Sequence, residues 1–226
     1  MAAVSARAPR QSARRTQILD GLVELFLATG FLEFSVEDLA ERLQCSKSTL
    51  YAVAPSKEQL ITAVVRAFFR GATERIEARL AGESDPVGRI RVYLEAIPTE
   101  LAPASTAFFA DLDLFAPARE IYARNTAIAA RRVQELVQAA TVADRTLDAT
   151  FIGAVAGATM ESIQRGEMTA MTGLDGATAY RLLVDLIIAG VTGPPATRSG
   201  RRGRRHLQQP PLRAANEPSA AVVDIT

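Results

Sequence analysis

Apolar residues recur at intervals of three and four along most of the chain, which is the period of an amphipathic α-helix. The first such stretch ends at Gly30, a residue type that often closes a helix. Its repeating residues are Ile18, Leu22, Leu25, Phe26 and Thr29. The sequence shows no alternating runs rich in Val, Ile and Thr that are joined by Asn-Gly or Asp-Gly turns, the pattern of β-hairpins. The pattern therefore predicts an all-α protein.

The periodic segments and the breaks between them predict about nine helices. Two short helices are expected within residues 35–54, after the first. The later helices are expected at about 57–81, 87–101, 104–115, 118–141, 146–165 and 176–191. Breaks are expected near Gly82–Pro86, at Pro103 and Pro117, around Asp144, and across 166–176. Pro98 is expected to kink the helix at 87–101 or to end it early.

This pattern divides the chain into two helical domains with two tails. Residues 1–12 are expected to be a flexible basic arm, and 13–56 an N-terminal three-helix domain. Residues 57–192 are expected to form a C-terminal helical domain. From Gly193 onward Pro, Arg, Ser, Gln and Ala dominate, so 193–226 is expected to be a disordered basic tail.

The net charge of +1 conceals a strong asymmetry along the chain. Residues 1–17 and 192–226 each carry a formal charge of +4, which leaves −7 for the segment between them. Two basic ends on an acidic body fit an anionic partner. They also fit flexible ends that are basic for solubility, and charge alone does not decide between the two interpretations.

Three helix starts lie close together between residues 35 and 60. Ser35 precedes an acidic turn, Ser46 follows the turn Gln44-Cys45, and Ser56 begins a Ser-Lys-Glu-Gln capping box. Two short helices with a three- or four-residue turn make a helix-turn-helix, with a motif at about 35–54. The first turn of its second helix would enter a DNA major groove. The alternative is two ordinary capped helices in a helical protein.

Residues 14–60 resemble the DNA-binding domain of the TetR (tetracycline repressor) family. The matching segments are Arg15-Thr16-Gln17-Ile18-Leu19, Gly30-Phe31, Ser35-Val36-Glu37-Asp38-Leu39-Ala40, Ser46-Lys47-Ser48-Thr49-Leu50-Tyr51 and Pro55-Ser56-Lys57-Glu58-Gln59-Leu60. The resemblance implies a homodimer on a pseudo-palindromic double-stranded DNA operator. It also implies a small-molecule effector that moves the helix at 57–81, and repression as the usual mode.

Position by position, the resemblance assigns DNA contacts to one set of residues. These are Arg14, Arg15, Ser35, Ser46, Lys47, Ser48, Thr49, Tyr51 and Lys57. The chain departs from the family pattern at Gln44 and Ser48, where Gly is usual. It departs again at Ala52-Val53-Ala54, which lacks an aromatic residue and a frequent phosphate contact. An alternative is therefore a helical ligand-binding protein with a degenerate helix-turn-helix that no longer binds DNA.

Aromatic and small residues mark two further expectations for the C-terminal domain. A pocket for a mainly apolar, neutral or cationic ligand is expected from Phe108, Phe109, Phe115, Tyr122, Phe151 and Met160, which could equally be plain core. Small residues permit close approach of helices, and the resemblance implies a dimer interface on the last two long helices. The dimer residues expected there are Gly153, Gly157, Leu183 and Ile187.

The chemistry of the chain argues against the main alternative class, an enzyme. His206 and Cys45 are the single histidine and cysteine, so Ser-His-Asp, Cys-His and histidine-based metal sites have no candidates. We therefore expect no catalytic residue, metal or cofactor. Cys45 is interpreted as a small buried hydrophobic residue. With no run of eighteen apolar residues and no signal peptide, we expect a cytoplasmic protein without a membrane partner.

Overall fold

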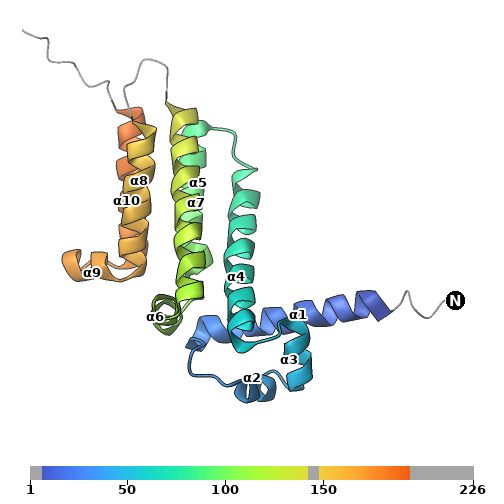
Figure 1. Ribbon diagram of the computed structural model, residues 1–226. Helices are drawn as coiled ribbons and strands as arrows, with labels where there is room; N and C mark the ends of the chain where they lie inside the picture. The colour runs from blue at the N-terminus through green and yellow to red at the C-terminus, as the bar shows by residue number, and fades with distance from the viewer. Residues whose placement is uncertain (1–6, 142–147, 194–226) are drawn as a thin grey trace, which may run out of the picture. The chain divides into compact units, whose positions relative to one another are not determined.

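Capping residues set where most of the helices begin. The computed structural model describes residues 7–141 and 148–193, with side chains from residue 13. Its helices are α1 (Arg7–Thr29), α2 (Val36–Arg42), α3 (Lys47–Val53), α4 (Lys57–Leu80), α5 (Pro86–Leu101), α6 (Thr106–Leu114), α7 (Ala116–Ala140), α8 (Ala149–Gln164), α9 (Glu167–Thr172) and α10 (Gly176–Thr192) (Figure 1). Within these ranges the protein is all-α, as the periodicity predicts.

The serines singled out in the sequence cap the short helices. Ser35 accepts a hydrogen bond from the backbone N–H of Asp38, and the Asp38 carboxylate accepts one from Ser35 in return, which completes a capping box. Ser46 and Ser56 each accept from the backbone N–H three residues later, at the starts of α3 and α4. These caps satisfy amides that would otherwise lack a partner at the helix ends.

Three sequence expectations about helix boundaries need correction. The backbone is already helical at Arg7, so the second half of the expected flexible arm belongs to α1. Pro117 lies in the first turn of α7, where its missing N–H costs nothing. Of the two outcomes expected at Pro98, an early end does not occur, since α5 continues to Leu101. The segment expected to be a break contains α9, flanked by Gly166 and Gly173 in the left-handed conformation. The described helices thus number ten; the basic tail expected at 193–226 lies outside the described residues, apart from Gly193.

Two hydrophobic cores organise these helices, and α4 contributes to both. The first core combines α1–α3 and the N-terminal part of α4 with residues of α6 and α7, including Phe108, Leu112 and Tyr122. The second combines Ile76 and Leu80, near the end of α4, with α5, α7, α8 and α10. The sequence placed a domain boundary between residues 56 and 57, whereas the first core packs across it.

Helices α7 and α8 pack closely within the chain, at two glycines that the sequence assigned to the dimer interface. A Cβ atom on Gly153 would lie 2.8 Å from the carbonyl oxygen of Ala130, and one on Gly157 would lie 2.9 Å from the Ala130 Cβ. Both glycines therefore serve contact between helices of the same chain. Leu183 and Ile187 are buried in the second core, so they also face inward.

Among residues 7–141 and 148–193, no helix combines the length and apolar character that crossing a membrane requires.

We expect Gly153→Ala to lower the free energy of unfolding by about 1–3 kcal/mol, because the backbone of α7 leaves no space for a methyl group. Gly71→Ala, on α4, is the matched control. Its Cβ would meet only the movable end of Arg75 at 3.1 Å, so the better helix propensity of Ala should stabilise the protein by about 0.5–1 kcal/mol. Urea unfolding of both variants measures this difference, and equal effects would contradict the close α7–α8 packing.

Candidate functional site

The turn between α2 and α3 has the geometry of a helix-turn-helix. Gln44 adopts a left-handed backbone with φ of 48°. Its N–H donates to the carbonyl of Glu41 at 3.0 Å, and the N–H of Cys45 donates to that of Ala40 at 2.9 Å. These two bonds form a Schellman motif, which offsets the roughly 1 kcal/mol cost of a left-handed residue other than Gly. The departure at Gln44 therefore leaves the turn intact.

The first turn of α3 presents polar side chains to solvent. The hydroxyl of Ser46 lies 2.7 Å from that of Ser48 and 2.9 Å from that of Thr49. Lys47 and Tyr51 are about half exposed, and the Lys47 ammonium donates to the Glu37 carboxylate on α2. This bond lowers the pKa of Glu37. The end of a helix with free amides, hydroxyls and one cation suits phosphate and base edges.

The remaining residues expected to contact DNA are placed around this turn, and several hold it in shape. Arg15 on α1 donates to the carbonyl of Val53 at 3.2 Å, which fixes the C-terminal end of α3. Lys57 donates to the carbonyl of Leu32 at 2.8 Å. Ser35 is occupied in its capping box, and the exposed Arg14 donates to Gln17 at 2.9 Å. Arg15 and Lys57 therefore have a structural role whether or not they also meet DNA.

The unusual residues at the end of α3 fill the core. Val53 and Ala54 are buried in the first core, and Ala52 is exposed. The departure therefore removes a possible DNA contact without disturbing the packing of α3. Cys45 is half-buried against the same core, and this burial raises the pKa of its thiol, which fits an unreactive small residue.

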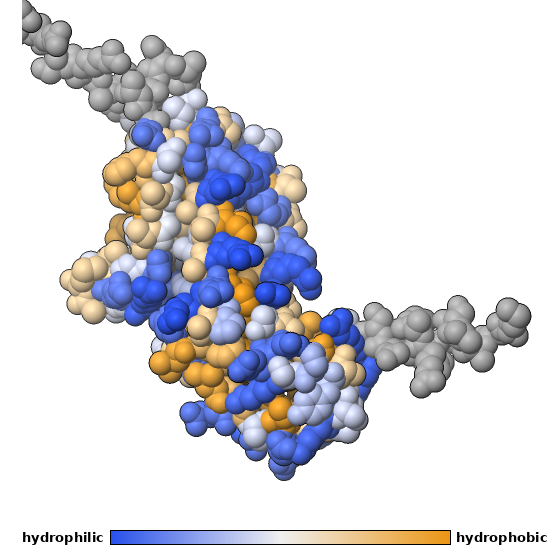
Figure 2. Space-filling model, viewed as in Figure 1, coloured by the Kyte–Doolittle hydropathy of each residue, from blue (hydrophilic) through white to orange (hydrophobic). Residues whose placement is uncertain are grey.

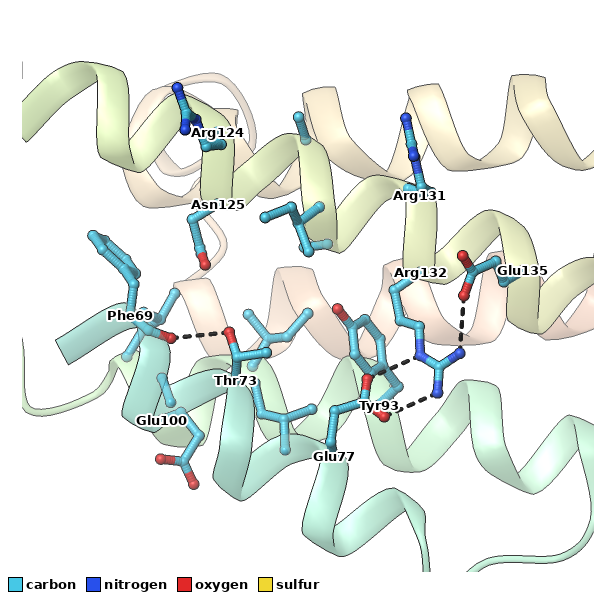
Figure 3. A pocket seen from close by; sticks show the side chains of 17 residues that line it. Phe69, Thr73, Glu77, Tyr93, Glu100, Arg124, Asn125, Arg131, Arg132 and Glu135 are labelled. Atoms are coloured by element: carbon cyan, nitrogen blue, oxygen red, sulfur yellow. Dashed lines mark hydrogen bonds and ion pairs between the residues drawn. The ribbon is translucent and has the colours of Figure 1, made fainter. Parts of the chain in front are cut away.

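A cavity of about 620 Å³ lies between α4, α5 and α7 (Figure 3). Its apolar wall includes Phe69, Ile76, Ile97 and Ile128. In Figure 2 a strip of hydrophobic surface lies between α7 and α4, bordered by hydrophilic residues. Such a partly apolar space with a few polar groups is typical of a small-molecule site.

One end of the cavity carries a network of charged side chains. Arg132 of α7 binds both carboxylate oxygens of Glu77 on α4 at 2.9 Å, through Nε and one terminal nitrogen. Its other terminal nitrogen donates to Glu135 at 2.9 Å. The ring of Tyr93 on α5 lies beside this network, and burial raises the pKa of its hydroxyl, which stays protonated at neutral pH. Arg132 therefore links α7 to α4 at the cavity.

A second charged cluster joins α5 to α4. Glu100 is the one charged side chain that is buried among the described residues. Its carboxylate accepts from Arg75 at 2.5 Å and from Arg79 at 2.8 Å, both on α4. In Figure 3 the carboxylate points away from the cavity, so this cluster braces the cavity wall and does not face a ligand.

A carboxylate on α6 connects the C-terminal helices to the N-terminal three. Asp111 accepts hydrogen bonds from the backbone N–H groups of Phe31, at 2.5 Å, and Leu32, at 2.9 Å. Both amides follow Gly30, whose φ of 80° turns the chain at the end of α1. The N–H of Ser105 also donates to the carbonyl of Leu27 at 2.8 Å. These bonds, called the Asp111 clasp below, fasten α6 to the end of α1.

Residues 18–64 match the family model of bacterial regulatory proteins of the tetR family. This segment runs from the middle of α1 into α4 and contains the whole helix-turn-helix. The N-terminal helices of this chain are thus similar to those of tetR-family regulators.

Solved structures of regulators have the same fold along most of the chain. A TetR/AcrR regulator from Thermobifida fusca is 25% identical, with a TM-score of 0.56 over 79% of this chain and 98% of its own. A transcriptional regulator from Saccharomonospora viridis, solved in complex with choline, is 19% identical, with a TM-score of 0.63 over 78% and 96%. The fatty acid degradation regulator FadR from Bacillus halodurans is 14% identical, with a TM-score of 0.60 over 79% and 96%. None of the curated proteins compared matches this chain.

The six residues expected to bind ligand do not line the cavity. Phe108, Phe109, Phe115 and Tyr122 are part of the first core or pack against it, and Met160 is buried in the second. Phe151 is 63% exposed on α8. The alternative interpretation, plain core, therefore describes five of the six.

The sequence did not predict the lining of the cavity, because the apolar pattern used to predict the pocket does not include the charged residues at one end of the cavity. Glu77 and Arg132 are 55 positions apart, and no local pattern connects them. Neither Asp111 nor the acidic residues of the cavity were among the site residues that the sequence predicted. No cluster of His, Cys, Asp and Glu suited to a metal ion occurs within the described ranges.

We expect Asp111→Ala to lower the free energy of unfolding by about 1–3 kcal/mol, because two partly buried N–H groups lose their acceptor. Asp113→Ala is the control, since Asp113 is exposed on the same helix and its side chain makes no part of the clasp. Amide hydrogen exchange should accelerate at Phe31 and Leu32 only in the Asp111 variant. Unchanged exchange at both amides would show that the clasp does not hold α6 to α1.

Proposed function

We propose that the protein is a homodimeric repressor that binds a pseudo-palindromic operator and is released by a small, mainly apolar ligand. The observation that carries the proposal is the exposed first turn of α3, which follows a tight turn inside the segment that matches the TetR family. Such a regulator acts where the chromosome is, in the cytoplasm.

The geometry of α3 supports DNA binding over the alternative of a degenerate helix-turn-helix. Ser48 is small and exposed, so the helix can approach base edges closely. Lys47 is held toward Glu37 in the free protein, and a phosphate can replace that carboxylate. Val53 and Ala54 sustain the packing of α3, so the missing contact at its end weakens the interface without removing it.

The position of the cavity supports control by a ligand. Three of its sides are α4, α5 and α7, and α4 begins directly after the turn that ends α3. A ligand that favours one placement of α4 by about 1–3 kcal/mol is sufficient to change operator occupancy measurably. The similar regulator from Saccharomonospora viridis was solved in complex with choline, which supports a small-molecule site in a protein of this fold.

An exposed apolar face on α8 and α10 supports a dimer. Phe151, Leu182 and Leu186 are 63%, 52% and 68% exposed, and α8 packs beside α10 (Figure 1). Figure 2 shows hydrophobic surface over these two helices. A second copy of the chain would cover this face, as the TetR resemblance implies. The proposed interface lies on α8 and α10, the two helices that the sequence analysis assigned to the dimer. It uses their exposed sides, whereas the residues expected from the sequence are buried.

We expect Lys47→Ala to weaken operator binding by about 1–3 kcal/mol if Lys47 reads a base, and to reduce the salt slope by about one if it meets phosphate. Glu37→Gln should strengthen binding, because it frees Lys47 and removes a negative charge near DNA. Fluorescence anisotropy with the DNA upstream of the gene, at several salt concentrations, measures both. Arg70→Ala is the control for loss of one exposed cation on α4. Equal behaviour of the Lys47 and Arg70 variants would remove Lys47 from the interface.

We expect Leu186→Asp to convert the dimer to a monomer, because a second copy would bury an unpaired charge. Leu114→Asp places the same substitution on a leucine that is 76% exposed on α6, and it should remain dimeric. Light scattering at micromolar concentration, with circular dichroism to verify folding, separates the two. A wild-type monomer under these conditions would refute both the interface and the operator model.

A further inference from the structure

The charged end of the cavity has one more negative charge than positive. Arg132 is shared by two carboxylates, Glu77 and Glu135, and three of its N–H groups donate to them. The two other arginines of the lining, Arg124 and Arg131, are exposed and point away from the cavity in Figure 3. Neither therefore compensates the surplus inside.

The surplus carboxylate is open to a ligand. The side chains of Arg132, Glu77 and Glu135 are 28%, 40% and 52% exposed, so the network borders the cavity and is not sealed in the core. Glu135 accepts one bond from Arg132 through a single oxygen, whereas Glu77 uses both. A carboxylate has about four acceptor positions, so Glu135 retains most of its capacity.

The rest of the cavity suits the apolar body of such a ligand. Phe69, Ile76, Ile97 and Ile128 supply apolar surface along α4, α5 and α7. The ring of Tyr93 lies next to the charged network, where its face can attract a cation. Within the described residues neither the Tyr93 hydroxyl nor the Asn125 amide makes a side-chain hydrogen bond, so both are available to a polar ligand atom.

We propose that this cavity binds a lipophilic cation, with its ammonium group against Glu77 and Glu135 beside the ring of Tyr93 and its alkyl part along the apolar wall. An anionic ligand would have to approach Arg132 between two carboxylates that already bind it, and would add a third negative charge to the group. A cation instead completes the charge balance. The inference rests on the proposed function only in treating this cavity as the effector site.

The ligand class is tested by calorimetry on the full chain without DNA. The probes are decyltrimethylammonium, decanoate and decanol, which share an alkyl chain and differ in charge. The cation should bind about tenfold more tightly than decanoate. Tighter binding of decanoate, or equal binding of all three probes, would overturn the proposal.

Two substitutions that change the charge in opposite directions locate the cation. Glu135→Gln keeps the bidentate bond between Arg132 and Glu77 and should weaken binding of decyltrimethylammonium about threefold to tenfold. Arg132→Gln leaves two unbalanced carboxylates and should strengthen it. Glu95→Gln is the control, because Glu95 is exposed on α5, pairs with Arg91 and does not line the cavity. Decanol should bind all variants alike.

A response of the cation to Glu95→Gln as large as its response to Glu135→Gln would overturn the assignment of the site. Because these measurements contain no DNA, their result is independent of operator binding. If the charge dependence holds while the protein fails to bind any operator, the ligand class stands and the proposed repressor function is wrong.

Discussion

Helix α4 is packed into two hydrophobic cores at once, and this constraint governs the rest of the molecule. Residues from Leu60 to Phe69 belong to the core around α1–α3, whereas Ile76 and Leu80 belong to the core of the C-terminal helices. Close-packed interiors transmit displacement because they have little free volume to absorb it. A shift of α4 in one core must therefore be accommodated in the other. Packing of α4 alone is then sufficient to connect the cavity to the helix-turn-helix.

The other connections reinforce this constraint from both sides. The Asp111 clasp holds α6 against the end of α1, where Phe31 and Phe108 meet with ring centroids 5.9 Å apart. Arg132 ties α7 to α4, and Glu100 ties α5 to α4 through two arginines. The cavity is thus enclosed by helices that are each linked to α4 by charge as well as by packing. Substitution of these charged groups should affect regulation more than substitution of solvent-facing charges elsewhere.

Sequence reasoning succeeded where the structure depends on local rules. The caps at Ser35, Ser46 and Ser56 and the helical period placed the end of α1, the helices α2–α4 and the turn between α2 and α3 nearly to the residue. Sequence reasoning failed where a residue's environment depends on which other helix its own helix packs against. Periodicity identified apolar stripes on α8 and α10 but could not show that Leu183 faces inward and Leu186 outward. The cavity depends on pairs such as Glu77 and Arg132, which only the tertiary fold brings together, and α9 is too short to show a period.

The most direct test of the coupling through α4 is amide hydrogen exchange of the protein with and without its operator. Because coupling between two sites is reciprocal, operator binding should change exchange at the cavity as well as at the DNA interface. The account predicts altered protection in α3, at Phe31 and Leu32, and along the cavity-facing parts of α4, α5 and α7, with no such change for unrelated DNA of equal length. Protection changes confined to α1–α3, with α5 and α7 unaffected, would contradict it.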